Sequence, residues 1–165
     1  MSTAVWLVAA IVLLACYVTW TAGRLDRLHA RVDARWAALD AQLVRRAATA
    51  RGMLPLLEPG PVREQLDAAS AAALEADETG REAIENDVSR ALRAAVLLLH
   101  GQPDADHVRS ELELAATRVG LARSFHNSAV QATLAVRRRR LPRALRLAGH
   151  RALPSYFDVD DTGLM

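Results

Sequence analysis

The chain has 165 residues, which is enough for one small domain and a membrane anchor. Aromatic residues make up only 4% of it, all 21 basic residues are arginine, and the formal net charge is +2. A single cysteine excludes an intrachain disulfide and a cysteine-rich metal site.

An uncharged segment lies near the start of the chain. The nineteen residues from Ala4 to Ala22 carry no charge. A helix of about 20 apolar residues is long enough to cross the hydrocarbon layer of a membrane, which is about 30 Å thick. Trp6 near one end, and Tyr17 and Trp20 near the other, match the aromatic belts of membrane interfaces. We therefore predict a transmembrane helix over residues 4–22.

Arginines determine the predicted orientation of this helix. Residues 1–3 have no basic side chain, whereas the apolar segment is followed by Arg24, Arg27, Arg31 and Arg35. Basic flanks stay in the cytoplasm. We therefore predict residues 1–3 outside the cytoplasm and everything after Gly23 inside it.

Two other interpretations of the apolar segment are open. A cleaved secretory signal needs a basic region before the apolar run, and none is present. Leu13-Leu14-Ala15-Cys16 loosely resembles a lipoprotein cleavage box, and lipidation of Cys16 would place the domain outside the cytoplasm. The apolar run continues past Cys16 to Trp20, which favours a membrane-buried cysteine.

Helical periodicity begins directly after Gly23. Apolar residues recur at spacings of 3, 4, 4, 3 and 4, which predicts one buried stripe on a helix that runs to about Arg51. These residues are Leu25, Leu28, Val32, Trp36, Leu39 and Leu43. The following MLPLLEPGP segment contains three prolines and a glycine and cannot continue the helix.

Three more helices are predicted further along the chain. The second begins at Pro61 and presents Val62, Leu66, Ala69 and Ala73 on one face, until Glu78-Thr79-Gly80 interrupts it. The third presents Ile84, Val88, Ala91, Ala95 and Leu98, and it stops at His100-Gly101. The fourth can be capped by Asp104 or Asp106 and carries a long stripe from Val108 to Val136, in which Gly120 is tolerable at a close helix contact.

The predicted fold is therefore all-α, with an N-terminal transmembrane helix that continues into an antiparallel up-down four-helix bundle over residues 24–140. An Arg-rich amphipathic segment over residues 141–151 and an acidic tail over residues 152–165 follow. In this topology the fourth helix returns its arginine-rich end to the membrane side.

Several stretches resemble a known family. The first bundle helix carries Trp36, Asp40, Gln42, Arg45 and Arg46; E-N-D-V-S-R-A-L lies in the third helix, and A-R-S-F-H-N-S-A-V, with Arg123 and Asn127, in the fourth. Leu141-Pro142 and P-S-Y-F-D, residues 154–158, follow in the same order. The chain resembles the bacterial LemA proteins. It departs from their pattern after the paired arginines, where AATARG intervenes, and at His126, where the family usually has an aromatic residue.

The resemblance implies a protein of the bacterial plasma membrane with a helical bundle of undefined activity. Some similar proteins help to shape bacterial intracellular membranes, so the resemblance also implies a part in membrane organisation.

The polar residues of the first and fourth helices are candidates for an interaction site. Asp40, Gln42, Arg45 and Arg46 form a cluster that Arg123 and Asn127 could face from the fourth helix. Interhelical hydrogen bonds that fix the register explain them as well as a partner or oligomer surface does. Neither a nucleophile with an adjacent base nor a histidine pair at metal-ligand spacing is present, so we predict no catalytic residue, cofactor or metal.

The arginines after the fourth helix are candidates for the membrane surface. They are Arg137, Arg138, Arg139, Arg140, Arg143 and Arg146. Juxtamembrane arginines bind anionic lipid headgroups, whereas nucleic acid is disfavoured because no aromatic residues interleave the run. The run could equally be a solvated helix end that complements the helix dipole.

From these patterns we expect a non-enzymatic scaffold or adaptor that binds the bilayer and either a protein partner or further copies of itself. The alternatives are a regulatory binding module for a membrane enzyme or protease, and an extracytoplasmic lipoprotein with the same bundle.

Overall fold

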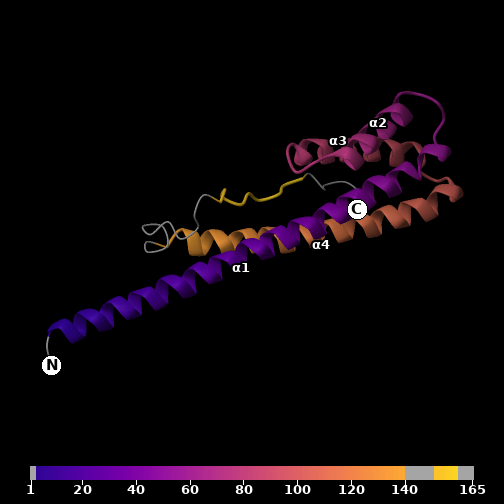
Figure 1. The fold of residues 1–165 in the computed structure, drawn as a ribbon. Coiled ribbons are helices and arrows are strands. Elements are labelled where there is room, and N and C mark those ends of the chain that lie inside the picture. Colours follow the sequence, from indigo (N-terminus) through magenta and orange to yellow (C-terminus); the bar gives the residue numbers. More distant parts are fainter. Residues whose placement is uncertain (1–2, 140–150, 160–165) are drawn as a thin grey trace. The chain divides into compact units, whose positions relative to one another are not determined.

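The computed structural model describes residues 3–139 and 151–159. Its helices are α1 (Thr3–Arg51), the short 3₁₀ helix η1 (Leu54–Leu56), α2 (Pro61–Glu75), α3 (Arg81–Leu98) and α4 (Pro103–Arg137) (Figure 1). All regular secondary structure in the described residues is helical, which confirms the all-α prediction. The predicted amphipathic segment over residues 141–151 lies almost entirely outside the described residues, and so does the end of the acidic tail after Val159.

One uninterrupted helix, α1, contains both the apolar segment and the first helix of the bundle. It runs for 49 residues and passes through Gly23 without a break. Its beginning is long and apolar enough to cross a membrane, and the most apolar stretch is not buried within the protein, whereas Thr21 near the end of the segment is only 3% exposed. Large apolar side chains such as Trp6 and Leu13 are 65% and 71% exposed. An exposed apolar stretch of this length near the start of a chain is typical of a membrane span or of a signal sequence.

The chain divides into two compact units. The first comprises Met1–Arg35 and His126–Tyr156, and the second comprises Trp36–Phe125 and Phe157–Met165. Both long helices contribute to both units.

The first unit pairs α1 with the end of α4. Val32 of α1 shares a small apolar cluster with Ala129, Val130 and Leu134 of α4. Arg137, the last residue of α4, lies 3.3 Å from the ring of His29 of α1, measured from Nη1 to Nε2. The end of α4 is therefore beside α1 only seven residues beyond Ala22, or about 10 Å along the helix axis.

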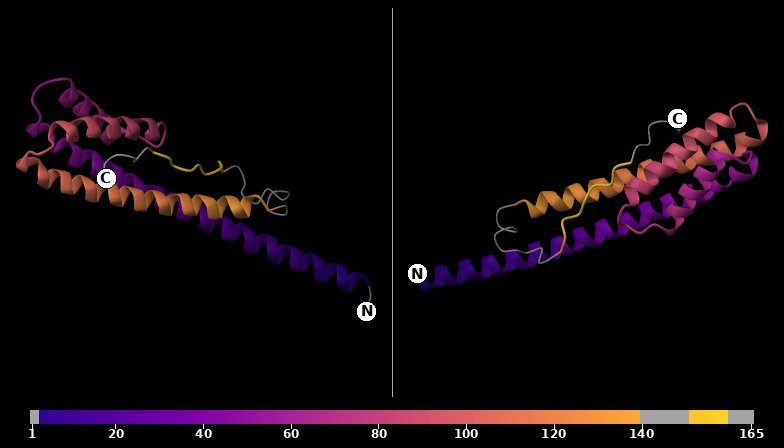
Figure 2. Two further views of the ribbon diagram at one scale, coloured as in Figure 1. Left: turned by 180° about the vertical axis from the view of Figure 1, so that it is seen from behind. Right: turned by 90° about the horizontal axis from the view of Figure 1, so that it is seen from above.

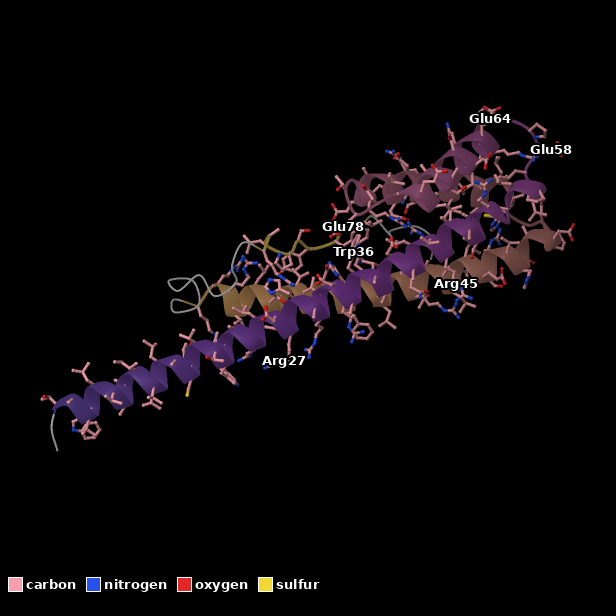
Figure 3. The ribbon with its side chains drawn as sticks, in the orientation of Figure 1. Arg27, Trp36, Arg45, Glu58, Glu64 and Glu78 are labelled. Atoms are coloured by element: carbon pink, nitrogen blue, oxygen red, sulfur yellow. The ribbon has the colours of Figure 1, made fainter. Side chains whose placement is uncertain are left out.

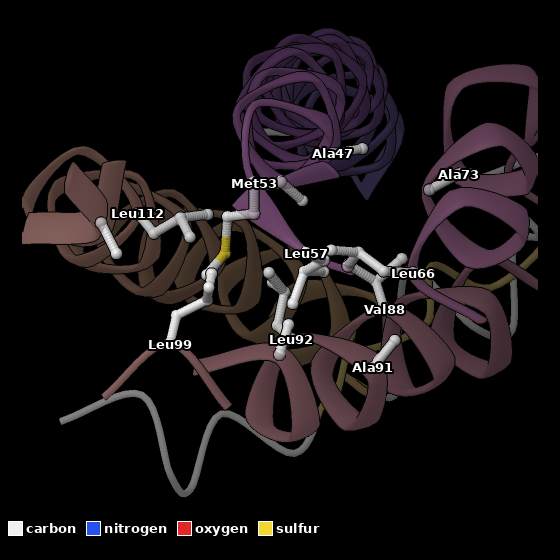
Figure 4. Close-up of a cluster of buried hydrophobic side chains, with 13 residues drawn as sticks. Ala47, Met53, Leu57, Leu66, Ala73, Val88, Ala91, Leu92, Leu99 and Leu112 are labelled. Atoms are coloured by element: carbon white, nitrogen blue, oxygen red, sulfur yellow. The ribbon is translucent and has the colours of Figure 1, made fainter. Parts of the chain in front are cut away.

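The second unit is a four-helix arrangement around one apolar core. Buried residues from α1, α2, α3 and α4 meet there, together with Met53 and Leu57, which flank η1 (Figure 4). Leu39 of α1 clusters with Val119 of α4, whereas the later Ala50 shares a core with the earlier Leu112. The two helices therefore run antiparallel, as the sequence predicts.

The breaks between the helices follow from proline and glycine. Pro61 occupies the first turn of α2, where its missing N–H is not needed. Gly80 precedes α3 with a φ of 78°, in the left-handed region that glycine adopts without steric cost. Because α2 ends at Glu75 and α3 begins at Arg81, the two are separate helices that pack against each other.

Three local predictions are wrong. Helix α4 begins at Pro103, so Asp104 and Asp106 lie inside its first turn and not at the N-cap position. Their negative charges there interact favourably with the helix dipole. A Cβ atom at Gly120 would meet nothing within 4 Å, so no close helix contact requires glycine there. Leu98 is 59% exposed, because α3 ends at this residue and Leu99 is buried in its place.

Candidate functional site

An ionic cluster lies in the core of the second unit. Arg46 of α1 and Arg81 and Glu85 of α3 are each at most 1% exposed. Arg46 Nη2 donates a hydrogen bond of 2.7 Å to Glu85 Oε2, and Arg81 Nε donates one of 3.0 Å to Glu85 Oε1. One carboxylate therefore holds two guanidinium groups, one on each of its oxygens.

Further contacts complete the cluster. Arg81 Nη1 lies 3.1 Å from a carboxylate oxygen of the half-exposed Asp40 and donates to the carbonyl oxygen of Ala76 at 2.8 Å. The backbone carbonyl of Glu85 accepts from the hydroxyl of Ser89 at 2.9 Å. The two arginines and two carboxylates have no net formal charge together. Burial of such charges is tolerable only because each is paired.

The cluster joins α1 to α3 and is suited to fixing their register. Both carboxylate oxygens of Glu85 already accept from a guanidinium group, and the core excludes water from Glu85. This arrangement gives the four charges a structural role. Among the described residues, no group of three or more histidine, cysteine or acidic side chains is positioned to hold a metal ion.

The predicted polar cluster is thus divided among different partners. Asp40 and Arg46 pair with α3, whereas Arg45 of α1 is exposed (Figure 3). Gln42 is half-buried, and its Oε1 has no hydrogen-bond partner within residues 3–139 and 151–159. Arg123 binds the end of the chain, as described below. Asn127 belongs to the other unit and is half-buried there.

Arg81 and Glu85 are not among the predicted site residues. The signal was present, because residues 81, 85, 88, 92, 95 and 99 form a helical stripe, and all six are buried. The predicted stripe was centred one position away, on Ile84 and Ala91. Two charges at the start of an otherwise apolar stripe indicate a buried ion pair.

Residues 151–159, which we call the strap, run in an extended conformation (Figure 1; Figure 2). In the second unit, Phe157 and Val159 are 3% and 4% exposed. They cluster with Leu39 and Leu43 of α1 and Val119 of α4, with Trp36 and Ala122 packed alongside. The rings of Trp36 and Phe157 meet edge to face with centroids 5.5 Å apart.

Polar contacts fix the backbone of the strap in both units. In the second unit, the N–H of Asp158 donates to Glu82 Oε1 at 2.7 Å, and Arg123 Nη1 donates to the carbonyl oxygen of Val159 at 2.7 Å. In the first unit, Arg137 donates to the carbonyl oxygens of Arg151 and Ala152, at 3.0 and 2.8 Å. The sequence analysis predicted only an acidic tail here, although Phe157 and Val159 alternate with the exposed Tyr156 and Asp158 in a pattern typical of an extended segment.

Arg137 and His29 form a second polar contact in the first unit. His29 Nδ1 lies 2.9 Å from the carbonyl oxygen of Leu25, which can only accept, so this nitrogen carries a proton. Its Nε2 faces the Arg137 guanidinium, which can only donate, and therefore accepts. Arg137 is thus engaged within the protein, with contacts to α1 and to the strap.

The other predicted membrane-surface arginines have different environments. Arg138 and Arg139 are exposed, whereas Arg140, Arg143 and Arg146 lie outside the described residues. In the first unit beyond the apolar segment, the described residues include eight arginines and two aspartates, a formal charge of +6. We call these eight residues the basic collar: Arg24, Arg27, Arg31, Arg35, Arg137, Arg138, Arg139 and Arg151.

The second unit has the opposite charge. Its described residues contain ten arginines and fifteen carboxylates, a formal charge of −5. The chain's small net charge of +2 conceals this segregation. Positive charge is concentrated in the unit that contains the apolar segment, as in the juxtamembrane regions of proteins whose basic side faces anionic lipid.

A groove of about 540 Å³ lies between α2 and α3 of the second unit. Ala68, Ala69, Ala72 and Ala91 form most of its lining, with Gln65, Asp87 and Arg90 beside them. Asp87 and Arg90 are paired with each other. Its polar groups do not form a reactive set, since the lining includes neither a nucleophile nor a base beside one.

Comparisons of the chain with family models, with curated proteins and with solved structures found no match.

Proposed function

We propose that the protein is a non-enzymatic scaffold or adaptor, anchored in a membrane by the start of α1. The observation that carries the proposal is the contrast within this one helix. The large apolar side chains from Val5 to Leu14 are exposed, whereas the later part of the helix supplies Leu39, Leu43 and Ala47 to packed cores. A helix whose first part has an exposed apolar surface and whose second part packs into a helical bundle is suited to hold that bundle at a membrane.

The proposed topology is a single span with the bundle in the cytoplasm. Its support is the basic collar, four of whose arginines follow the apolar segment directly on α1. Arg24 also lies over the ring of Trp20, with Cζ 5.5 Å from the ring centroid. Tryptophan and arginine side by side are typical of a membrane interface.

The proposed ligands of the collar are anionic lipid headgroups. Arg138 and Arg139 support this proposal best, because both are exposed and lie at the end of α4, within the unit that contains the apolar segment. Each arginine near an anionic surface contributes about 1 kcal/mol to binding. Arg137 contributes less, since its guanidinium is bound to the strap.

We further propose that the chain belongs among the LemA-like proteins of bacterial plasma membranes. Support comes from the residues that carry the resemblance. Asp40 and Arg46 pair with α3, and Trp36 and Phe157 pack against each other. Contacts of this kind hold the parts of the bundle together, and a bundle needs them whichever partner it binds.

The test of anchoring and topology uses reporter fusions to the full chain. We expect a reporter fused after Met165 to be active only in the cytoplasm, and the unshortened protein to resist extraction from membranes by alkaline carbonate. A reporter active only outside the cytoplasm would contradict the proposed orientation. A shortened mature chain would indicate a cleaved signal, and fatty-acid labelling that is lost in Cys16→Ser would indicate the lipoprotein.

A further inference from the structure

The end of the strap occupies a built recognition site in the second unit. We call this the strap site and define it by Trp36, Leu39, Leu43, Glu82, Val119, Ala122 and Arg123. Two alternate side chains of the strap, Phe157 and Val159, are buried there, while Asp158 between them points outward and is exposed. This alternation is how an extended peptide presents one face to a receptor.

The strap site also recognises the peptide backbone. Glu82 accepts from the N–H of Asp158, and Arg123 donates to the carbonyl of Val159. The Arg123 guanidinium lies 3.7 Å from the Asp158 carboxylate as well. The site therefore fits an extended segment that places an aromatic and an aliphatic side chain two residues apart.

We propose that the strap site of one copy binds the strap of a second copy, so that the protein self-associates by strap exchange. The inference deepens the scaffold function proposed above and rests on it. Every contact that the strap makes within its own chain can be made identically with the strap of another copy. Exchange of an identical element is therefore a route to association that needs no new surface.

The small size of the attachment makes exchange between copies feasible. In the second unit it consists of two buried side chains and two backbone hydrogen bonds. Anchoring in one bilayer raises the concentration of neighbouring straps, which favours exchange against binding within one chain.

The test is complementation between two full-length variants with different tags. In the strap-deficient copy, Phe157→Ser and Val159→Ser remove the buried side chains. In the site-deficient copy, Arg123→Glu removes the donor to Val159 and repels Asp158. Mixed in one membrane, the two variants retain one functional strap and one functional site between them. We expect mixed pairs to form roughly tenfold more than pairs of either variant alone, because one lost contact of this kind weakens binding by about that factor.

Matched variants complete the test. Arg118→Glu makes the same charge change at an exposed position of α4 and should leave pairing unchanged. Ala122→Trp, which fills the space beside Phe157, replaces Arg123→Glu if that variant loses its helical circular dichroism. Mixed pairing no greater than that of the separate variants would overturn the proposal, as would full self-association of the strap-deficient copy.

The same samples separate this inference from the anchoring proposal. Carbonate extraction reports whether each variant is held in the membrane, and pairing is measured again in detergent at raised protein concentration. Loss of anchoring with complementation retained in detergent contradicts the anchored scaffold and supports strap exchange. Anchoring without complementation contradicts strap exchange alone.

Discussion

At the scale of single residues, the burial of Glu85 requires the two arginines that flank it. A carboxylate without solvent exposure is stable only if its charge is compensated by partners, and here Arg46 and Arg81 compensate it on both oxygens. The two arginines depend on Glu85 in the same way, since each is at most 1% exposed. The stability of all three residues is therefore mutual.

Loss of the Glu85 charge should destabilise the second unit strongly. We expect Glu85→Gln to lower the free energy of unfolding by about 3–5 kcal/mol, because it removes the negative charge that the buried Arg46 and Arg81 share and leaves the half-exposed Asp40 facing Arg81. Denaturant unfolding of the purified protein, followed by circular dichroism, measures the change. Glu113→Gln, which neutralises an exposed glutamate on α4, should change stability by less than about 0.5 kcal/mol.

Joint replacement of Arg46, Arg81 and Glu85 by methionine or leucine should recover most of the stability lost in Glu85→Gln. A buried ion cluster contributes little beyond a well-packed apolar one of the same volume. If the triple variant is less stable than Glu85→Gln, the cluster has a role beyond pairing its own charges.

The contact between Trp36 and Phe157 gives a direct optical report of strap docking. In a Trp6→Phe, Trp20→Phe background, Trp36 is the only tryptophan in the chain. We expect Phe157→Ala to shift the emission of Trp36 to longer wavelength, because the ring loses its edge-to-face partner and gains water. Tyr156→Ala, at a 51% exposed neighbour, should leave the emission unchanged. An unchanged spectrum in Phe157→Ala would contradict the docked strap.

At the scale of helices and turns, two glycines have opposite roles. Gly80 has a φ of 78° and joins α2 to α3, whereas Gly120 lies inside α4 with open space where a side chain would go. Alanine is strained in the first conformation and favoured in the second. The two positions thus form a matched pair for a single type of substitution.

We expect Gly80→Ala to destabilise the protein by about 1–2 kcal/mol and Gly120→Ala to stabilise it by about 0.5–1 kcal/mol. Thermal unfolding of both variants measures the two effects in one experiment. A destabilised Gly120→Ala variant would mean that another surface approaches α4 at this residue, such as a partner chain.

Sequence patterns predicted the elements better than their ends and contacts. The stripe from Leu25 to Leu43 predicted a helix because a period of 3.6 residues is set by the backbone itself. The start of α4 was misassigned because proline at its first position competes with capping by Asp104. The strap was missed because nothing in its local sequence specifies the distant residues against which Phe157 packs. Its partners on α1 and α4 are set only by the tertiary fold.

At the scale of the whole molecule, charge is segregated between the two units. The basic collar belongs with the apolar segment, and the excess of carboxylates belongs to the second unit. If the protein is anchored as proposed above, an anionic bilayer would attract the first unit and repel the second, each over about one Debye length. Composition alone could not reveal this division of charge. The arginines at the end of α4 belong to the first unit only because that end of α4 packs against the first part of α1.

The preference for anionic lipid should depend on Arg138 and Arg139. We expect Arg138→Gln with Arg139→Gln in the full chain to weaken the preference of the reconstituted protein for phosphatidylglycerol over phosphatidylcholine by about 2 kcal/mol, roughly 30-fold, since each surface arginine contributes about 1 kcal/mol. The lipids retained by the protein after partial delipidation, quantified by mass spectrometry, report the preference. Arg45→Gln with Arg118→Gln removes two exposed arginines from the acidic second unit and should have little effect.

Raising the salt concentration should reduce the preference of the unaltered chain and barely change that of the Arg138/Arg139 variant, because screening acts on exposed charges at the bilayer surface. Equal lipid selectivity in both double variants would contradict the assignment of the exposed end of α4 to the membrane surface.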